Sequence, residues 1–253
     1  MIKKRLLAPG PTTVPDKVLL SMAEPVIHHR TPQFTEILGE TEEGLKYVFQ
    51  TKNDVYILAA SGTGAMEASI VNLLSPGDKA LVIQGGKFGE RFTEIAKAYN
   101  IEVETIDVAW GRAVDPGIVQ DRLSADNSIK AVYATLCETS TGVVNDIQAL
   151  GKIVAKSAAV LAVDVISGLG AMEFNADDWG VDVVIGGSQK GLMMPPGLAM
   201  ISVSKKAWEL VEKSTSPRFY LDLRAYKKSM AKIDTPYTSG VTLIIGLNKA
   251  LKM

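Results

Sequence analysis

Short apolar runs alternate with segments of helical periodicity from residue 55 to residue 204, and this alternation limits the possible folds most strongly. Nearly continuous apolar strands separated by helices are typical of a mostly parallel sheet that helices cover on both faces. The predicted strands are 55–60, 79–84, 101–108, 130–136, 159–165, 181–187 and 198–204. The predicted helices are 33–50, 63–74, 89–99, 116–125, 145–157, 205–214 and 240–253. We therefore expect an α/β fold with a mostly parallel, seven-stranded sheet flanked by helices.

The last two predicted strands, 181–187 and 198–204, are joined by a connection too short for a crossover helix. A parallel neighbour requires such a crossover, so 198–204 is expected to run antiparallel at that point. Residues 1–20 are predicted to form an extended N-terminal segment, and residues 21–253 one large domain. The last predicted helix stops without a capping residue, as a helix does where a chain has been cut.

Charge and hydropathy narrow the partners that this chain can have. The 27 basic and 28 acidic residues give a net charge of −1 without long runs of one sign, which disfavours nucleic acid and an anionic membrane surface. No stretch approaches the roughly 20 apolar residues of a membrane helix, and the N-terminus lacks the apolar run of a signal peptide. We therefore expect a cytoplasmic protein whose partners include neither nucleic acid nor a membrane.

Metal and disulfide chemistry have few candidate residues. Cys137 is the only cysteine, which excludes an intrachain disulfide and a four-thiolate zinc site. The only two histidines, His28 and His29, are adjacent in sequence, and such a pair is a poor set of metal ligands. No metal site is predicted.

Polar residues follow three of the predicted strands, at the ends where open α/β sheets collect their ligands. After the first strand, Ser61, Gly62 and Thr63 begin a helix, whose free N–H groups and dipole favour an anion such as a phosphate. The same residues could serve only as a helix cap with glycines for a tight turn. The P-loop lysine is missing from this segment, so the pattern alone leaves both alternatives open.

Two charged residues stand at the ends of other apolar strands. Asp164 is costly there unless it meets a cation or hydrogen-bond donors, so it is either the partner of a cationic ring nitrogen or a cap for the next turn. Lys190, in "IGGSQKG", is either a nucleophilic amine, part of a structural ion pair, or a lysine that reaches solvent. A phosphate site, an aspartate and an amine at three strand ends are together what pyridoxal phosphate requires.

Four motifs resemble one known family. "SQKGLMMPPG", "VDVISGLGAMEF", "ETSTGV" and the N-terminal "LLAPGPTTVP" are similar to segments of class V aminotransferases, in the branch of the alanine–glyoxylate and serine–glyoxylate (serine–pyruvate) enzymes. The resemblance spans essentially the whole chain. It implies the large domain of a fold-type I transferase that depends on pyridoxal 5′-phosphate, in a homodimer whose active sites are shared between the subunits.

The resemblance implies a role for each motif residue. Lys190 would form the Schiff base, and Asp164 would hold the pyridine nitrogen protonated. The other implied cofactor contacts are Ser61, Gly62 and Thr63 at the phosphate-side turn, Phe88 stacked on the ring, Thr139 at the polar edge of the ring, and Gln189 near the phosphate. Thr238 would reach the phosphate of the partner subunit, although Gly240 stands where many relatives have proline. From the residues alone, Phe88 could also be a core side chain and Thr139 a turn hydroxyl.

The implied activity is transamination. An amino group would move from a small amino acid, alanine or serine, to a 2-oxo acid such as glyoxylate or pyruvate, with ping-pong kinetics and the freed Lys190 as general base. Family members continue into a small C-terminal domain that supplies an arginine for the substrate carboxylate. That domain is expected to be missing here, which leaves Arg30 or Arg218 as candidates to replace its arginine.

Three other functions compete with transamination. A lyase or cysteine desulfurase on the same scaffold would need a mobile cysteine and usually a histidine before the lysine, where Gln189 stands instead. A cofactor-binding scaffold without turnover, acting as a partner subunit, agrees with the label "soluble hydrogenase subunit" that some chains of this branch carry. A nicotinamide-binding domain is excluded because no G-x-G-x-x-G follows the first strand.

Overall fold

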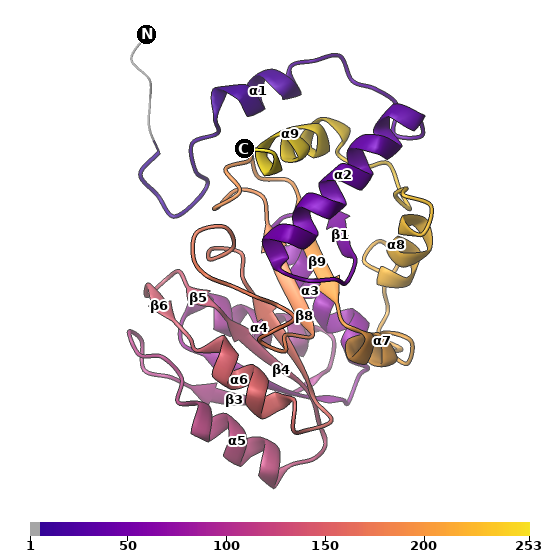
Figure 1. Cartoon of the computed structure of the whole chain (residues 1–253). Helices are drawn as coiled ribbons and strands as arrows, with labels where there is room; N and C mark the ends of the chain where they lie inside the picture. The colour runs from indigo at the N-terminus through magenta and orange to yellow at the C-terminus, as the bar shows by residue number, and fades with distance from the viewer. Residues whose placement is uncertain (1–5) are drawn as a thin grey trace.

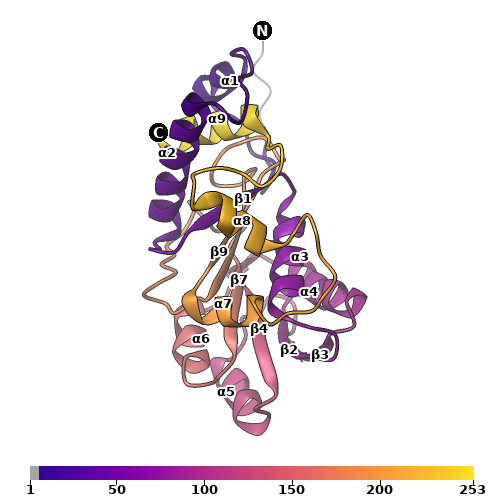
Figure 2. The ribbon, with the colours of Figure 1, turned by 90° about the vertical axis from the view of Figure 1, so that its right-hand side faces the viewer.

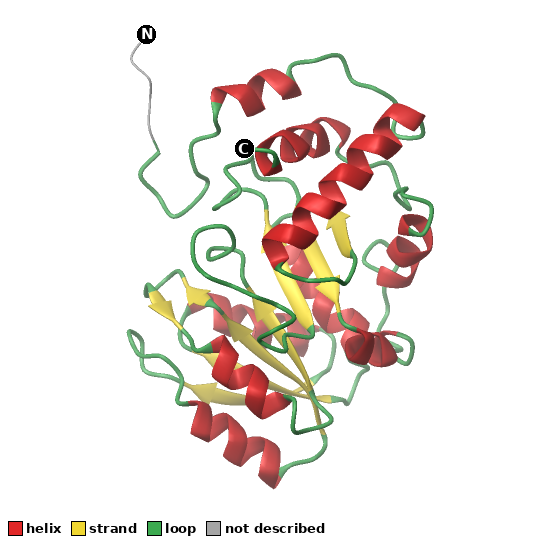
Figure 3. Ribbon diagram, viewed as in Figure 1, coloured by secondary structure: helices red, strands yellow, loops and turns green. Residues whose placement is uncertain are grey.

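The computed structural model describes residues 6–253 and has a seven-stranded sheet between two layers of helices (Figures 1 and 3). The strands, in their order across the sheet, are β1 (Val55–Leu58), β9 (Ala199–Val203), β8 (Val183–Gly187), β7 (Val160–Asp164), β4 (Ile129–Thr135), β2 (Lys79–Gln84) and β3 (Glu102–Asp107). Neighbours from β8 to β3 pair in parallel, and β9 runs antiparallel to both β8 and β1. The predicted α/β fold and the predicted reversal of the last strand are confirmed.

The helices cover the sheet on both faces, as Figures 1 and 2 show from two directions. They are α1 (Asp16–Met22), α2 (Pro32–Phe49), α3 (Gly62–Leu73), α4 (Lys87–Ala98), α5 (Pro116–Ala125), α6 (Ile147–Val154), α7 (Lys205–Val211), α8 (Leu223–Met230) and α9 (Val241–Leu251). The core on one face takes its helical side chains from α1, α2, α5, α6 and α9, and the core on the other face from α3, α4, α7 and α8. Within residues 6–253, no helix is both long and apolar enough to cross a membrane.

The central strands are continuous apolar runs in the sequence because helices cover both faces of the sheet. Every residue of β7, β8 and β9 is buried, because side chains on both faces of these strands meet helices. The edge strand β3 carries exposed or half-buried residues at most positions. The sequence pattern therefore follows the position of each strand in the sheet.

Five helices of the described chain begin with a side chain that caps them, whereas α1, α9 and the two helices that follow β1 and β2 do not. N-cap side chains accept a backbone N–H at five helices: Thr31 for α2, Asp115 for α5, Asp146 for α6, Ser204 for α7 and Asp222 for α8. At α3 and α4 the N-cap residues are Ser61 and Gly86, and neither gives its own helix a side-chain bond. Both of these helix starts therefore keep N–H groups for other acceptors.

Four short elements are absent from the sequence-based prediction. The helix α1 begins within the segment 1–20 that was expected to be extended; residues 1–5 of that segment lie outside the described part of the chain. The helix α8 buries only Leu223, Tyr226 and Met230. The strands β5 (Cys137–Glu138) and β6 (Val143–Val144) form a two-residue antiparallel pair. Each is too short, or too polar, to produce a clear periodicity.

Alanine substitutions at two helical glycines test how closely the helices pack. A Cβ added at Gly151 in α6 would lie 1.7 Å from the backbone oxygen of Trp179, which cannot easily move aside. We expect Gly151→Ala to lower the free energy of unfolding by about 1–3 kcal/mol. A Cβ at Gly39 in α2 would lie 3.4 Å from its nearest neighbour, so Gly39→Ala should be neutral or stabilise by up to about 1 kcal/mol. Urea unfolding of both variants measures the difference, and equal stability would contradict this contact.

Candidate active site

The sheet brings the polar strand ends together at one edge. Because β9 alone is reversed among the seven strands of the described sheet, β1 points in the same direction as β8, β7, β4, β2 and β3. The carboxyl ends of these strands therefore lie on the same side, which is where ligands bind in open α/β sheets. Lys190, Asp164, Ser61, Phe88 and Thr139 all follow or end strands of this set.

Lys190 lies in the turn after β8, covered by the N-terminal segment. The backbone N–H of Thr12 donates to the oxygen of Gln189 at 3.1 Å, and the Thr12 hydroxyl donates to the oxygen of Lys190 at 3.0 Å. A Cβ added at Gly10 would lie 2.4 Å from Cδ and 2.8 Å from Nζ of Lys190. The lysine side chain is therefore half-buried beneath a glycine that leaves it just enough room.

Asp164 ends β7 as a buried carboxyl group, 5% exposed. The pKa of Asp164 is raised to about 7, mainly by burial. A hydrogen bond of 2.7 Å from the N–H of Ile166 to Oδ1 acts to lower this pKa. The negative charge of Glu138 acts to raise it further. The positive charges of Arg91 and Lys190 act to lower the pKa. Oδ2 receives no hydrogen bond from any described residue, so this oxygen is free for a cationic or N–H partner.

The start of α3 has the features of an anion site. Gly62 fits against Ile166, because a Cβ at Gly62 would lie 2.3 Å from Cδ1 of that isoleucine. The Ser61 side chain is exposed and makes no capping bond to its helix. A guanidinium stands beside the same turn, since Nη1 of Arg91 donates to the Thr63 hydroxyl at 3.2 Å. Unpaired N–H groups, a helix dipole and a nearby cation together favour an anion here.

Phe88 lies in the first turn of α4. Its ring is half-buried, and Cζ of Arg91 lies 4.9 Å from the ring centroid. The Phe88 and Gly89 N–H groups donate to the carboxylate of Glu138, at 3.2 Å and 3.0 Å from Oε2. The acid that caps α4 therefore comes from β5, on a different part of the chain.

Gln189 and Thr139 complete the group of predicted residues at this edge. The Gln189 side chain lies against Gly187, and its Oε1 is buried without a hydrogen-bond partner among residues 6–253. A buried unpaired amide oxygen is costly, so it marks a place where a donor is missing. Thr139 is half-buried in the turn between β5 and β6.

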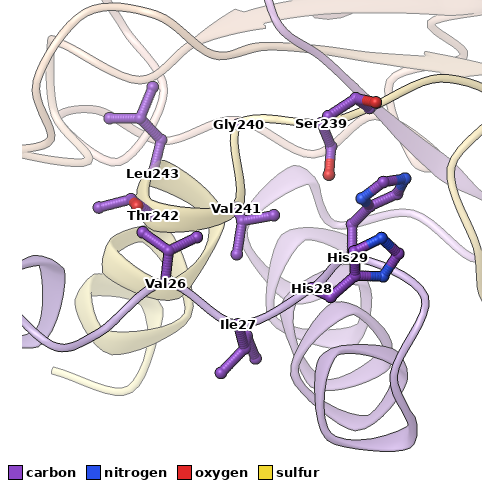
Figure 4. A pocket seen from close by; sticks show the side chains of 10 residues that line it. Val26, Ile27, His28, His29, Ser239, Gly240, Val241, Thr242 and Leu243 are labelled. Carbon is purple, nitrogen blue, oxygen red and sulfur yellow. The ribbon is translucent and has the colours of Figure 1, made fainter.

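Thr238 lies in a different place from the other predicted residues. It is exposed and lines a surface pocket between the connection from α1 to α2 and the start of α9. His28 and His29 line the same pocket (Figure 4). The lining of this pocket includes none of the strand-end residues. The two histidine rings stack at 4.6 Å, and no group of three or more metal-ligating side chains occurs in the described part of the chain.

The two arginines considered for the substrate carboxylate have structural partners. Arg30 forms an ion pair with Asp234. The Arg218 side chain is 3% exposed, and its Nη1 donates to backbone oxygens, including that of Val71. Val71 lies nine residues after Gly62 on α3, which corresponds to about 14 Å along a helix. This placement argues against Arg218 as the carboxylate anchor.

Sequence reasoning missed Glu138 and Arg91. Glu138 is 1% exposed, and a buried acid directly before the predicted Thr139 was the available signal. Arg91 lies three residues after Phe88 in α4, so helical spacing places the two side chains on the same face. Arg91 contacts Thr63 on α3 and Glu138 contacts the start of α4, and the sequence does not display such contacts between distant segments.

The buried carboxyl of Asp164 predicts a pH dependence of stability in the cofactor-free protein. Its pKa of about 7 lies above the reference value of 3.8, so the native state holds the proton more tightly than the unfolded state. Stability from this group is present below the unfolded pKa and is lost as pH rises through the native pKa. We expect Asp164→Asn to gain stability relative to the unmodified protein between pH 5 and pH 8, measured by urea unfolding.

Asp115→Asn, at the exposed cap of α5, is the control for removing a carboxylate. A stability difference for Asp164→Asn that stays constant across this pH range would contradict the raised pKa.

Comparison with known proteins identifies relatives over the whole described region. A profile of the family described as aminotransferase class-V matches residues 6–253. A Synechococcus protein named soluble hydrogenase, small subunit, is 48% identical over 99% of this chain and 66% of its own length. The L-aspartate–glyoxylate aminotransferase of Paracoccus denitrificans is 40% identical over 96% of this chain and 63% of its own length. The structure of alanine–glyoxylate aminotransferase from Nostoc sp. matches with a TM-score of 0.94 and 30% identity, over 100% of this chain and 68% of that one.

The match includes the sheet and the strand-end residues described above. The chain spans about two thirds of the length of the curated relatives. The family implies pyridoxal 5′-phosphate as the cofactor. The chain belongs to the class V aminotransferase family.

Proposed function

We propose that this chain is the cofactor-binding large domain of a pyridoxal-phosphate-dependent aminotransferase. One observation carries the proposal. Lys190, a half-buried amine, follows β8, and Asp164, a buried acid, ends the neighbouring strand β7. The two side chains are close enough for the charge of Lys190 to lower the pKa of Asp164. A cofactor with a charged ring, held between the amine and the acid, accounts for such a pair.

The residues fit the cofactor in three respects. Ser61, Gly62 and Thr63 start a helix whose N–H groups lack a side-chain cap, which suits a phosphate. The free oxygen of Asp164 suits the protonated nitrogen of a pyridine ring. The unpaired Oε1 of Gln189 suits a hydrogen-bond donor on the ligand or on a water molecule beside it.

Each residue then has a distinct part in amino-group transfer. Bound pyridoxal phosphate supplies an aldehyde that captures amino groups and a ring that accepts the electron pair left by a departing proton. Asp164 would keep a proton at the ring nitrogen, and Phe88 and Thr139 would hold the ring in place. Lys190 would hold the cofactor at rest, and its free Nζ would act as the base that takes the α-proton of the amino donor.

The substrates belong to this proposal as well. Two relatives described above are named for glyoxylate as amino acceptor, with aspartate or alanine as donor. We infer a small amino acid, alanine or serine, as donor and a 2-oxo acid such as glyoxylate or pyruvate as acceptor. We also infer a homodimer, in which the exposed Thr238 serves the site of the partner subunit.

A role as partner subunit without turnover is the second candidate, because one relative carries a hydrogenase subunit name. A stable complex with a redox enzyme, in a protein that binds no pyridoxal phosphate, would support it. A cysteine desulfurase is disfavoured because Cys137 lies within β5, paired with Val144, and not on a loop that could carry sulfur to a substrate.

Covalent trapping tests the role of Lys190. Borohydride reduction of the cofactor-loaded protein should add the cofactor mass to the peptide that contains Lys190, detected by mass spectrometry. Lys190→Ala should lose the label while it remains folded. Lys87→Ala is the matched control at the same edge of the sheet, where the exposed lysine pairs with Glu90 at 2.6 Å, and it should keep the label. An unchanged label in Lys190→Ala, or none in the unmodified protein, would refute the assignment.

Gly10→Ala tests whether the N-terminal segment positions Lys190. The added Cβ would overlap the flexible end of the lysine, 2.4 Å from its Cδ, so the lysine must move while the backbone stays in place. We expect several-fold weaker binding of pyridoxal phosphate, measured by absorbance titration, with a free energy of unfolding within about 1 kcal/mol of the unmodified protein. Binding as tight as in the Gly39→Ala control would show that Lys190 does not depend on this contact.

A further inference from the structure

We propose that Glu138 is a positioning residue that joins two walls of the candidate cofactor site. One wall is the start of α4 with Phe88, and the other is the turn 139–142 with Thr139. The inference rests on the proposed function only in that Phe88 and Thr139 face the cofactor. The contacts that carry it lie within the chain itself.

The Glu138 carboxylate is the cap that α4 lacks. Phe88 N–H donates to Oε1 at 3.3 Å and to Oε2 at 3.2 Å, and Gly89 N–H donates to Oε2 at 3.0 Å. The N-cap residue of α4 is Gly86, which has no side chain to offer. A negative charge at a helix N-terminus also interacts favourably with the helix dipole.

The local packing shows that no cap from α4 itself would fit. A Cβ at Gly86 would lie 2.4 Å from Oγ of Ser140 and 2.7 Å from Cδ of Glu138. The space that a serine or aspartate cap would need is therefore filled by the turn after β5. This close approach requires a glycine at the cap position and an acid on the other strand.

The same glutamate organises the turn that carries Thr139. The Ser140 hydroxyl donates to Oε1 at 2.6 Å and accepts from the Lys87 N–H at 3.0 Å, which links the turn to α4 a second time. The backbone oxygen of Glu138 accepts from the N–H groups of Thr141 and Gly142, at 3.1 Å and 2.8 Å. Phe88 and Thr139 are therefore fixed relative to each other through one buried side chain.

Glu138 also acts on the buried carboxyl group of Asp164. The groups that face Asp164 are Glu138 from β5, Arg91 from α4, Lys190 from the turn after β8, and the N–H of Ile166. After burial, the negative charge of Glu138 is the main influence that raises the pKa of Asp164. A neutral residue at 138 should let Asp164 ionise at lower pH, an effect that loosened packing alone would not produce.

Hydrogen exchange of the cofactor-free protein tests the positioning role first. Glu138→Ala should speed exchange of the amides of residues 86–90, and Glu138→Gln, which keeps one acceptor oxygen, should restore part of the protection. Asp146→Ala removes the cap of α6, where Asp146 accepts from the Ala149 N–H at 2.8 Å, and serves as matched control. It should leave exchange at 86–90 unchanged. Equal protection in all four proteins would overturn the proposal.

Titration with pyridoxal phosphate gives the second measurement. We expect Glu138→Ala to bind about tenfold more weakly, as for the loss of a buried helix cap. Glu138→Gln should recover affinity, with its pH profile of binding displaced to lower pH. An affinity and pH profile identical to those of the unmodified protein would overturn the proposal. Failure of the unmodified protein to bind would instead refute the proposed function, and the exchange experiment would still decide the role of Glu138.

Discussion

A carboxyl group buried at the end of a parallel strand is the constraint on which the rest of this structure depends. Asp164 is 5% exposed and has one backbone donor, so its ionised form is poorly compensated in the chain by itself. The arrangement is stable as an apolar sheet with a protonated acid, or as a charged acid facing a cation. Lys190 and Arg91 act in that direction, since their charges lower the pKa of Asp164, and a cationic ring nitrogen against Asp164 would add to them.

The N-termini of α3 and α4 lie at this same edge of the sheet, and neither is capped by its own N-cap side chain. Five helices in the described chain carry capping side chains of their own, whereas α1, α3, α4 and α9 do not. The start of α4 is instead closed by Glu138, and the start of α3 is left with its N–H groups near Arg91. The start of α3 therefore keeps N–H groups available for a ligand, as binding sites commonly do.

The strands and long helices could be predicted from sequence because their periodicity records burial on one or both faces. The reversal of β9 was also predictable, since a short connection cannot hold a crossover helix. The hairpin of β5 and β6 could not be predicted, because two residues per strand carry no period. The strand-end positions of Lys190, Asp164 and Ser61 could be predicted from the strand pattern. The roles of Glu138 and Arg218 could not, because Glu138 contacts Phe88, 50 positions away, and Arg218 contacts Val71, 147 positions away.

The most direct measurement of the central claim is a crystal structure of this chain grown with pyridoxal 5′-phosphate. Our account predicts continuous electron density from Nζ of Lys190 to the cofactor, with the ring nitrogen against Asp164 and the phosphate at the start of α3. Cofactor density at another place, or a ring that touches only one of these two side chains, would contradict it.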